Sequence, residues 1–186
     1  MSTSVKDCNC KRIIYDDCDK EICDEKCKMK KNRKAKPTTL SCGTGNSVTF
    51  DAVGSDNEVV IPSPSSAIVG QVSIDACDKG ISTIEIEFSS IVNLTASFDD
   101  ARGALIFRLF RTCGNDETEL VNTWTYEVLE IEDVNVITLS NSYSFTFCEC
   151  LKNAGCCSYF VEASVGGLIN IETLSVNNVQ ISAIVQ

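Results

Sequence analysis

The chain has 186 residues, of which 44% are apolar, and it carries a formal net charge of −10 at pH 7. This length and apolar content suffice for one domain with a real core, so the chain does not need disulfides merely to fold. The sequence has twelve cysteines and no histidine, which excludes the usual general base near neutral pH and every Cys-His or Ser-His catalytic pair. We therefore expect no enzyme, no catalytic residue and no cofactor.

Residues 1–36 form a separate unit of composition, called the arm below. They hold eleven of the sixteen lysines and arginines against seven acids, which makes the arm about +4 and residues 37–186 about −14. The arm's only apolar cluster, Ile13 to Tyr15, is too small to offset the entropy of ordering it. We expect it to be disordered alone and ordered against another subunit, in a helical or an extended form. It holds five cysteines: Cys8, Cys10, Cys18, Cys23 and Cys27.

The arm carries no sign of export, membrane insertion or nucleic-acid binding. No run of seven apolar residues follows a basic start, so we predict no Sec signal peptide. The whole chain has no 18-residue apolar stretch, which argues against a membrane span. Residues 26–36 carry seven bases, but no aromatic is interleaved and the acidic body would repel phosphate. We interpret them as a solvated linker.

Residues 37–186, the body, alternate short apolar runs with turn residues. Cys42 to Asn46 contains a lone GxG, which we interpret as a turn because no strand precedes it and no lysine completes a phosphate loop. Further turns are predicted at Asn141 and at Asn177-Asn178. The runs predict ten strands, at 47–53, 58–61, 67–76, 83–98, 104–112, 119–129, 134–139, 142–151, 156–165 and 168–185. Short strands with no helical pattern between them predict an all-β fold, an antiparallel jelly roll or β-sandwich.

A period of two assigns faces to several of these strands. Ile84, Ile86 and Phe88 alternate with two glutamates, and Leu105, Phe107 and Leu109 surround Arg108, so we expect one buried face and one wet face. We take Trp124 and Tyr126 as core or sheet surface. The acids at predicted turns solvate loops and give no support for a catalytic pair.

The segment from Tyr143 to Val161 holds four of the twelve cysteines. Its aromatic residues Tyr143, Phe145 and Phe147 alternate with polar residues, which predicts aromatics inward and thiols outward. Asn153 and Gly155 predict a turn that would make the segment a β-hairpin. We interpret its cysteines as a staple of that hairpin, with a metal site as the alternative: Cys148, Cys150, Cys156 and Cys157.

Three further cysteines stand alone in the body. Cys77 and Cys113 fall at predicted strand ends beside turns, where other chains can reach them, and Cys42 is similarly isolated. The alternative for each is a disulfide within the domain or a half-buried thiol. The cysteine spacings lack the C-x2-C knuckle of zinc ribbons, so we predict no metal site.

A basic arm with several thiols can dock on the acidic body of a neighbour and then be locked by disulfides. Head-to-tail repetition of such a contact grows a filament. The expected partner is therefore another copy of the chain, with no nucleic acid and no small-molecule substrate. The candidate residues for intermolecular cross-links are Cys8, Cys10, Cys18, Cys23, Cys27, Cys42, Cys77 and Cys113.

The cysteine-bearing arm, a body of about 150 residues that is predicted to be a jelly roll, and the segment FTFCECLKNAGCCSYF resemble the subunits of bacterial endospore appendages and related proteins of spore formers. In that family the body is a jelly roll and the N-terminal connector makes disulfides to subunits further along the fibre. The resemblance implies that Cys8 and Cys10 are connector thiols and that body cysteines are acceptors. It also implies an extracellular or spore-surface location, reached without a Sec signal.

Two other interpretations stay open from the sequence. The first is a cytosolic metal-binding or thiol-rich protein. The second is a monomeric β-sandwich module that binds a carbohydrate or a protein partner. Gel electrophoresis with and without a reductant separates these from the fibre, because only the fibre predicts a ladder of bands that collapses with thiol.

Overall fold

The computed structural model describes residues 38–51, 59–62, 64–76, 81–96, 101–131, 137–152 and 155–186. The predicted arm and Cys77 lie outside these ranges. No helix among the described residues is long and apolar enough to cross a membrane. The strands are β1 (Thr39–Cys42), β2 (Thr44–Gly45), β3 (Val48–Asp51), β4 (Ser66–Ala76), β5 (Ile81–Ala96), β6 (Ala101–Cys113), β7 (Glu119–Ile131), β8 (Ile137–Lys152), β9 (Gly155–Val165) and β10 (Ile171–Val185).

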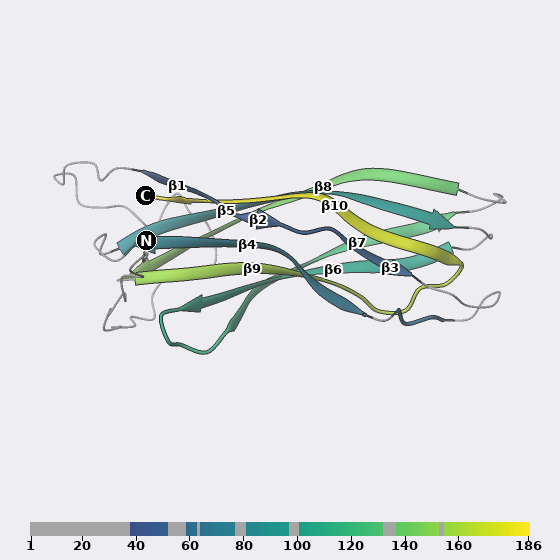
Figure 1. The fold of residues 1–186 in the computed structure, drawn as a ribbon, viewed down its shortest axis with the longest axis horizontal. Helices are drawn as coiled ribbons and strands as arrows, with labels where there is room; N and C mark the ends of the chain where they lie inside the picture. Colours follow the sequence, from purple (N-terminus) through teal and green to yellow (C-terminus); the bar gives the residue numbers. More distant parts are fainter. Residues whose placement is uncertain are drawn as a thin grey trace, which may run out of the picture.

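The strands form two antiparallel sheets that pack face to face as a sandwich (Figure 1). Sheet A has the order β1-β10-β5-β8, with β3 also paired to β10, and sheet B has the order β2-β4-β9-β6-β7. From β4 to β10, consecutive strands alternate between the sheets, except that β6 and β7 pair as a hairpin. This is the strand order of a jelly roll. The predicted all-β sandwich is therefore confirmed.

The alternation of inward and outward residues is confirmed in the strands where it was predicted. The inward residues of β5 and β6 are fully or almost fully buried, as the period of two requires: Ile84, Ile86, Phe88, Leu105, Phe107 and Leu109. The predicted strands from Ala67 onward correspond to β4 to β10, except that two of them fall in the single strand β8. The predicted strand at 58–61 is reduced to a single bridge between Val60 and Leu168.

Aromatic contacts between β7 and β8 close one long side of the sandwich. Phe145 of β8 stacks on Trp124 of β7 with 3.8 Å between ring centroids, and Tyr143 stacks on Phe107 of β6 at 4.7 Å. Tyr126 lies edge-on to Tyr143. Each such pair adds about 0.5–1.5 kcal/mol beyond the area it buries. The aromatic residues of β8 thus point inward as predicted, and they join sheet A to sheet B.

The residues from β1 to β3 close the other long side by crossing from sheet A to sheet B and back. The Gly43 amide donates a hydrogen bond to the Ile181 carbonyl at 2.9 Å. A Cβ atom at Gly43 would lie 2.2 Å from the Gln71 carbonyl oxygen, and one at Gly45 would lie 2.1 Å from the Val179 carbonyl oxygen. The turn predicted for Cys42 to Asn46 is wrong. The segment is an extended crossover in which only glycine permits so close an approach of two backbones.

The predicted hairpin of residues 143–161 is also wrong, because its two strands belong to different sheets. β8 pairs with β5, which sets Cys148 opposite Glu85 and Cys150 opposite Thr83. β9 pairs with β4 and β6 in the other sheet. Both strands have an apolar face, and placing them in opposite sheets turns these faces toward each other across the core. A short connection alone fits a hairpin or a crossover, and the pairing of β8 with β5 and of β9 with β4 and β6 shows that it is a crossover.

Two predicted turns lie inside continuous strands. Asn141 pairs with Val92 in the middle of β8, so residues 137–139 and the run at 142–151 belong to one strand. Asn177-Asn178 lies at a bulge of β10, where the register to β5 shifts. Asn178 has a φ of 50°, in the left-handed region that asparagine tolerates better than most residues.

Candidate functional site

The six cysteines among the described residues lie toward one end of the sandwich, called the cysteine end below. At this end β1, β5 and β9 begin and β6, β8 and β10 end, on the left in Figure 1. The described residues of the opposite end contain no cysteine. Thr38, through which the arm joins the body, also lies at the cysteine end, because Thr39 pairs with Val185. The structure thus gathers thiols that are far apart in sequence.

A disulfide joins Cys113 at the end of β6 to Cys157 near the start of β9. The two residues are direct partners in neighbouring strands, with 4.1 Å between their Cα atoms and 44 residues between them in sequence. Cys157 is only 2% exposed. Cys113 was predicted as a cross-link to other chains and Cys157 as part of the hairpin staple. Strand pairing instead sets the two side chains against each other inside one body, so the alternative for Cys113, a disulfide within the domain, is the one that the structure shows.

The remaining cysteines of the predicted staple belong to strands of different sheets, Cys148 and Cys150 to β8 and Cys156 to β9. Cys150 and Cys156 are each disulfide-bonded. Cys148 and Cys150 lie on the outer face of β8, and both are half-buried. Within the ranges that the structure describes, no group of three or more Cys, Asp or Glu is placed to hold a metal ion. The arm cysteines and Cys77 lie outside those ranges.

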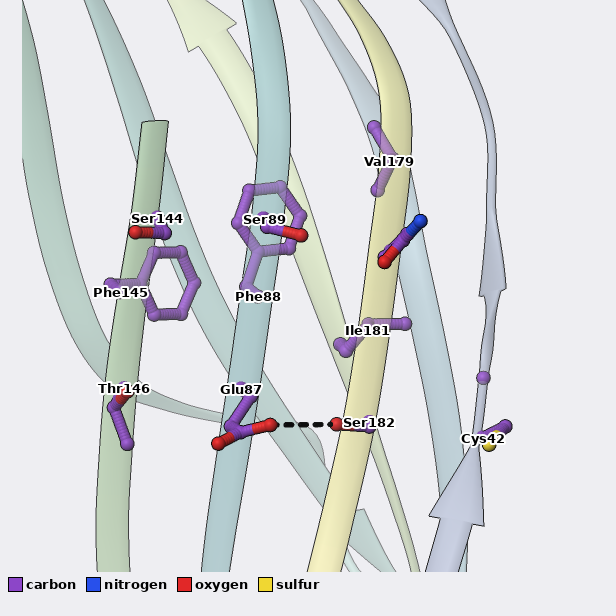
Figure 2. Close-up of a pocket in the computed structure, with 12 residues that line it drawn as sticks. Cys42, Glu87, Phe88, Ser89, Ser144, Phe145, Thr146, Val179, Ile181 and Ser182 are labelled. Atoms are coloured by element: carbon purple, nitrogen blue, oxygen red, sulfur yellow. Dashed lines mark hydrogen bonds between the residues drawn. The ribbon is translucent and has the colours of Figure 1, made fainter. Parts of the chain in front are cut away.

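Cys42 has a free, exposed thiol at the end of β1. It borders a hollow of about 530 Å³ on the outer face of sheet A (Figure 2). Along one row of this hollow, Cys42 pairs with Ser182, Ser182 with Glu87, and Glu87 with Thr146. The Ser182 hydroxyl donates to the Glu87 carboxylate at 3.3 Å, as Figure 2 shows. The hollow therefore presents a reachable thiol in one row with two hydroxyl groups and a carboxylate that lies two strands away from it.

A buried polar cluster lies behind the Cys113–Cys157 disulfide. The Arg111 guanidinium of β6 donates to Glu149 of β8 and, at 2.6 Å, to Glu119 of β7. The Tyr159 hydroxyl of β9 donates to the other oxygen of Glu149 at 2.5 Å. The Arg111 and Glu149 side chains are 10% and 15% exposed, and Tyr159 is fully buried. The cluster therefore ties sheet A to sheet B at the cysteine end.

The environment fixes the protonation of two of these groups. Burial, and after it the nearby Glu149 carboxylate, raises the pKa of Tyr159 far above its ordinary value, so the phenol stays neutral. Burial by itself lowers the pKa of Arg111, but Glu149 and Glu119 outweigh it and the pKa ends raised. The guanidinium stays charged and the phenol stays a donor. This arrangement suits a lasting structural contact, because neither group exchanges a proton near neutral pH.

Sequence reasoning missed this cluster, although a signal for it was present. Arg111 continues the inward series of Leu105, Phe107 and Leu109, and Glu149 continues that of the β8 aromatics. Two opposite charges at inward positions of two strands indicate a buried pair, because a lone charge in a core is too costly.

A family model described as a domain of unknown function (DUF4489) matches residues 36–186. None of the curated proteins matches the chain. Among solved structures, Eiger TNF from S. frugiperda is similar at a TM-score of 0.38 and 16% identity, over 81% of this chain and 93% of that chain. The infectious bursal disease virus Gt strain structure is similar at 0.33 and 11%, over 76% of this chain and 33% of that chain. Neither structure, nor the family description, names an endospore appendage.

Proposed function

The chain belongs to the family of DUF4489 domains, and we propose that it is a structural, non-enzymatic subunit whose copies assemble into a disulfide-linked fibre. The arm of one copy docks on the body of the next, and thiols of the arm form bonds to body cysteines. In keeping with the resemblance to endospore appendages, such a fibre belongs outside the cell or on the spore surface.

One observation carries this proposal: the exposed Cys42 thiol lies in β1, the first strand of the body, four residues after Thr38, where the arm joins. An arm thiol of a neighbouring copy can reach it without any change in the sandwich. The surroundings of the two thiols are complementary in charge, since Lys11 and Arg12 follow Cys10 and Glu87 lies in the row of Cys42. Opposite charges favour the encounter that precedes a bond.

The cross-link is the oxidation of two thiols to one disulfide. One S–S bond forms, two S–H bonds break, and two electrons and two protons pass to dioxygen as the oxidant. Cytosolic thiols are kept reduced, so the reaction belongs to an oxidising environment. A fibre that oxidises after release from the cell therefore needs no oxidant inside it.

We predict that Cys8→Ser with Cys10→Ser, or Cys42→Ser alone, removes the multimers that a reductant dissolves. The thermal midpoint of the monomer should stay nearly unchanged, because none of these changes touches the buried core. The measurement is gel electrophoresis with and without thiol, beside thermal unfolding of the monomer.

The matched control is Cys113→Ser with Cys157→Ser, which also removes two cysteines. It opens a bond that spans 44 residues, so the free energy of unfolding should fall by about 4 kcal/mol on the chain-entropy model, while the multimers remain. Tandem mass spectrometry of the oxidised wild type should find Cys42 bonded between chains. A single monomer band would contradict the fibre and support a binding module, and stoichiometric zinc would support a metal-binding protein.

A further inference from the structure

An apolar row crosses the outer face of sheet B. It consists of Phe160 of β9, Phe110 of β6 and Leu120 of β7, and is called the Phe row below. Phe160 pairs with Phe110 and Phe110 with Leu120, so the three side chains are direct neighbours. The two phenylalanine rings stack with 5.1 Å between centroids, and Leu120 is 50% exposed. The row thus presents a continuous apolar surface on the outside of the sandwich.

The outer face of sheet A has no stacked aromatic pair among the strands that the structure describes, and its exposed Leu40 is followed across the sheet by Ile184 and then Glu85. Its row through Cys42 continues with Ser182, Glu87 and Thr146, all polar. Single exposed apolar residues are common on proteins, but a stacked aromatic pair extended by an exposed leucine marks a contact surface. The stacked aromatic pair therefore distinguishes the outer face of sheet B.

The Phe row leads to the edge that carries Cys42. Phe160 pairs with Gln71 of β4, and Gln71 pairs with Thr44 of β2, two residues beyond Cys42. Strands lie about 4.8 Å apart, so the Phe160 backbone is about 10 Å from Thr44, and Cys42 is about 7 Å further along the chain. A ligand lying on the row thus extends toward this edge of the sandwich. Because the Cys42 thiol lies on the outer face of sheet A, a chain that continues from the row reaches the thiol by passing around the edge.

We propose that the Phe row docks the arm segment Lys11 to Asp17 of a second copy, an inference that rests on the proposed function. Ile13 to Tyr15 is the only apolar cluster of residues 1–36, so the segment is the part of the arm that gains from an apolar surface. With Tyr15 over Phe110 and Leu120 and Ile13 over Phe160, the chain continues toward Cys42. Cys10 and Cys8 lie three and five residues before Ile13, about 10 and 17 Å of extended chain, which matches the distance to the edge.

The length of the arm and the charges of both parts fit this occupant. Residues 16–37 span up to about 75 Å when extended, longer than the about 50 Å of the 16-residue strand β8. The arm therefore reaches the face of a neighbour from its own cysteine end. A second body is the poorer occupant, because two bodies of about −14 each repel, whereas the arm is about +4.

The test replaces Tyr15 in the full chain with the photo-cross-linking residue p-benzoylphenylalanine. Unlabelled and 15N-labelled copies are mixed with a reductant present, irradiated and digested, and the cross-linked peptides are identified by mass spectrometry. The expected result is cross-links from position 15 to the peptides of Phe110 and Leu120, joining unlabelled to labelled chains. Leu120→Ser should lower their yield about tenfold, as expected for losing one half-exposed leucine contact.

Ile61→Ser is the control, because Ile61 is 70% exposed and its segment pairs with Leu168 at the end opposite the cysteines. It should leave the yield unchanged, and thermal midpoints verify that both variants fold. Cross-links to sheet A, cross-links within single chains only, no cross-links, or equal effects of both variants would each overturn the docking. A ladder of disulfide-linked bands on the gel, without photo-cross-links to the Phe row, would overturn this inference and leave the fibre standing. Photo-cross-links to the Phe row without such a ladder would overturn the covalent fibre and leave the docking standing.

Discussion

Glu149 and Arg111 occupy inward positions that the period of two would give to apolar residues. Their ion pair is stabilised there because Glu119 accepts a second hydrogen bond from Arg111 and Tyr159 donates to the second oxygen of Glu149. Breaking such a pair by removing one partner leaves a charge uncompensated, which typically costs about 3–5 kcal/mol. The cluster also fixes which inward residues of β8 lie opposite β6 and β9, so these few residues set the relative placement of the sheets.

We predict that Tyr159→Phe removes a part of the pH dependence of stability. Above about pH 10 an unfolded tyrosine loses its proton, whereas Tyr159 in the folded protein keeps it, because burial and Glu149 raise its pKa. The folded state then binds more protons than the unfolded state. The free energy of unfolding of the wild type therefore falls as pH rises above about 10, by up to about 1.4 kcal/mol per pH unit.

Tyr159→Phe lacks this slope, while near neutral pH it loses about 1–3 kcal/mol with the hydrogen bond to Glu149. Urea unfolding between about pH 8 and 11 measures both effects. Tyr143→Phe is the comparison variant, because the pKa of Tyr143 is raised by burial alone, whereas that of Tyr159 is raised by burial and by Glu149. An alkaline slope in Tyr159→Phe equal to that of the wild type would show that Tyr159 ionises in the folded protein.

At the scale of the elements, the sequence predicts strands well and their partners poorly. The period of two locates β5, β6 and β9 because each buries one face. The same pattern does not say which sheet a strand joins, so β8 and β9 were predicted as a hairpin and Cys113 was left without its partner Cys157. Pairing depends on contacts between residues far apart in sequence. Local composition also cannot separate a glycine that turns the chain from Gly43, which lets two backbones touch.

We predict that Gly43→Ala destabilises the body. Its Cβ would overlap the Gln71 carbonyl and the Ile181 side chain, and relieving such overlap typically costs about 1–3 kcal/mol. Gly166→Ala is the matched control, because a Cβ there meets nothing within 4 Å, and it should change stability by less than about 0.5 kcal/mol. Denaturant midpoints of the two variants measure the difference. Equal midpoints would mean that the crossover moves away from β4 without loss.

At the scale of the whole molecule, charge and thiols are distributed unequally along the chain. The body of about −14 would repel other bodies, and the arm of about +4 supplies the opposite charge. The internal disulfide from Cys113 to Cys157 braces sheet B at the cysteine end, and the exposed Cys42 in sheet A stays available. A braced end with one reachable thiol allows covalent assembly without disturbing the core.

We predict from this distribution that the first contact between copies depends on salt and that the finished fibre does not. Exposed charges are screened beyond about 3 Å at 1 M salt and beyond about 10 Å at 0.1 M salt. Reduced protein should therefore associate more slowly at about 1 M salt than at about 0.1 M salt. Oxidised multimers should be insensitive, because a disulfide is not screened. Light scattering of reduced and oxidised samples at the two concentrations measures this.

Two substitutions locate the charges responsible. Glu87→Gln removes one negative charge from the row of Cys42 and should slow association at low salt. Glu172→Gln, at the start of β10 and so at the opposite end of the sandwich, removes the same charge and should have a smaller effect. Equal rates at both salt concentrations would mean that apolar contact with the Phe row, and not charge, brings the copies together. Equal slowing by both substitutions would point instead to the net charge of the body, because a local attraction falls off within about 10 Å at 0.1 M salt.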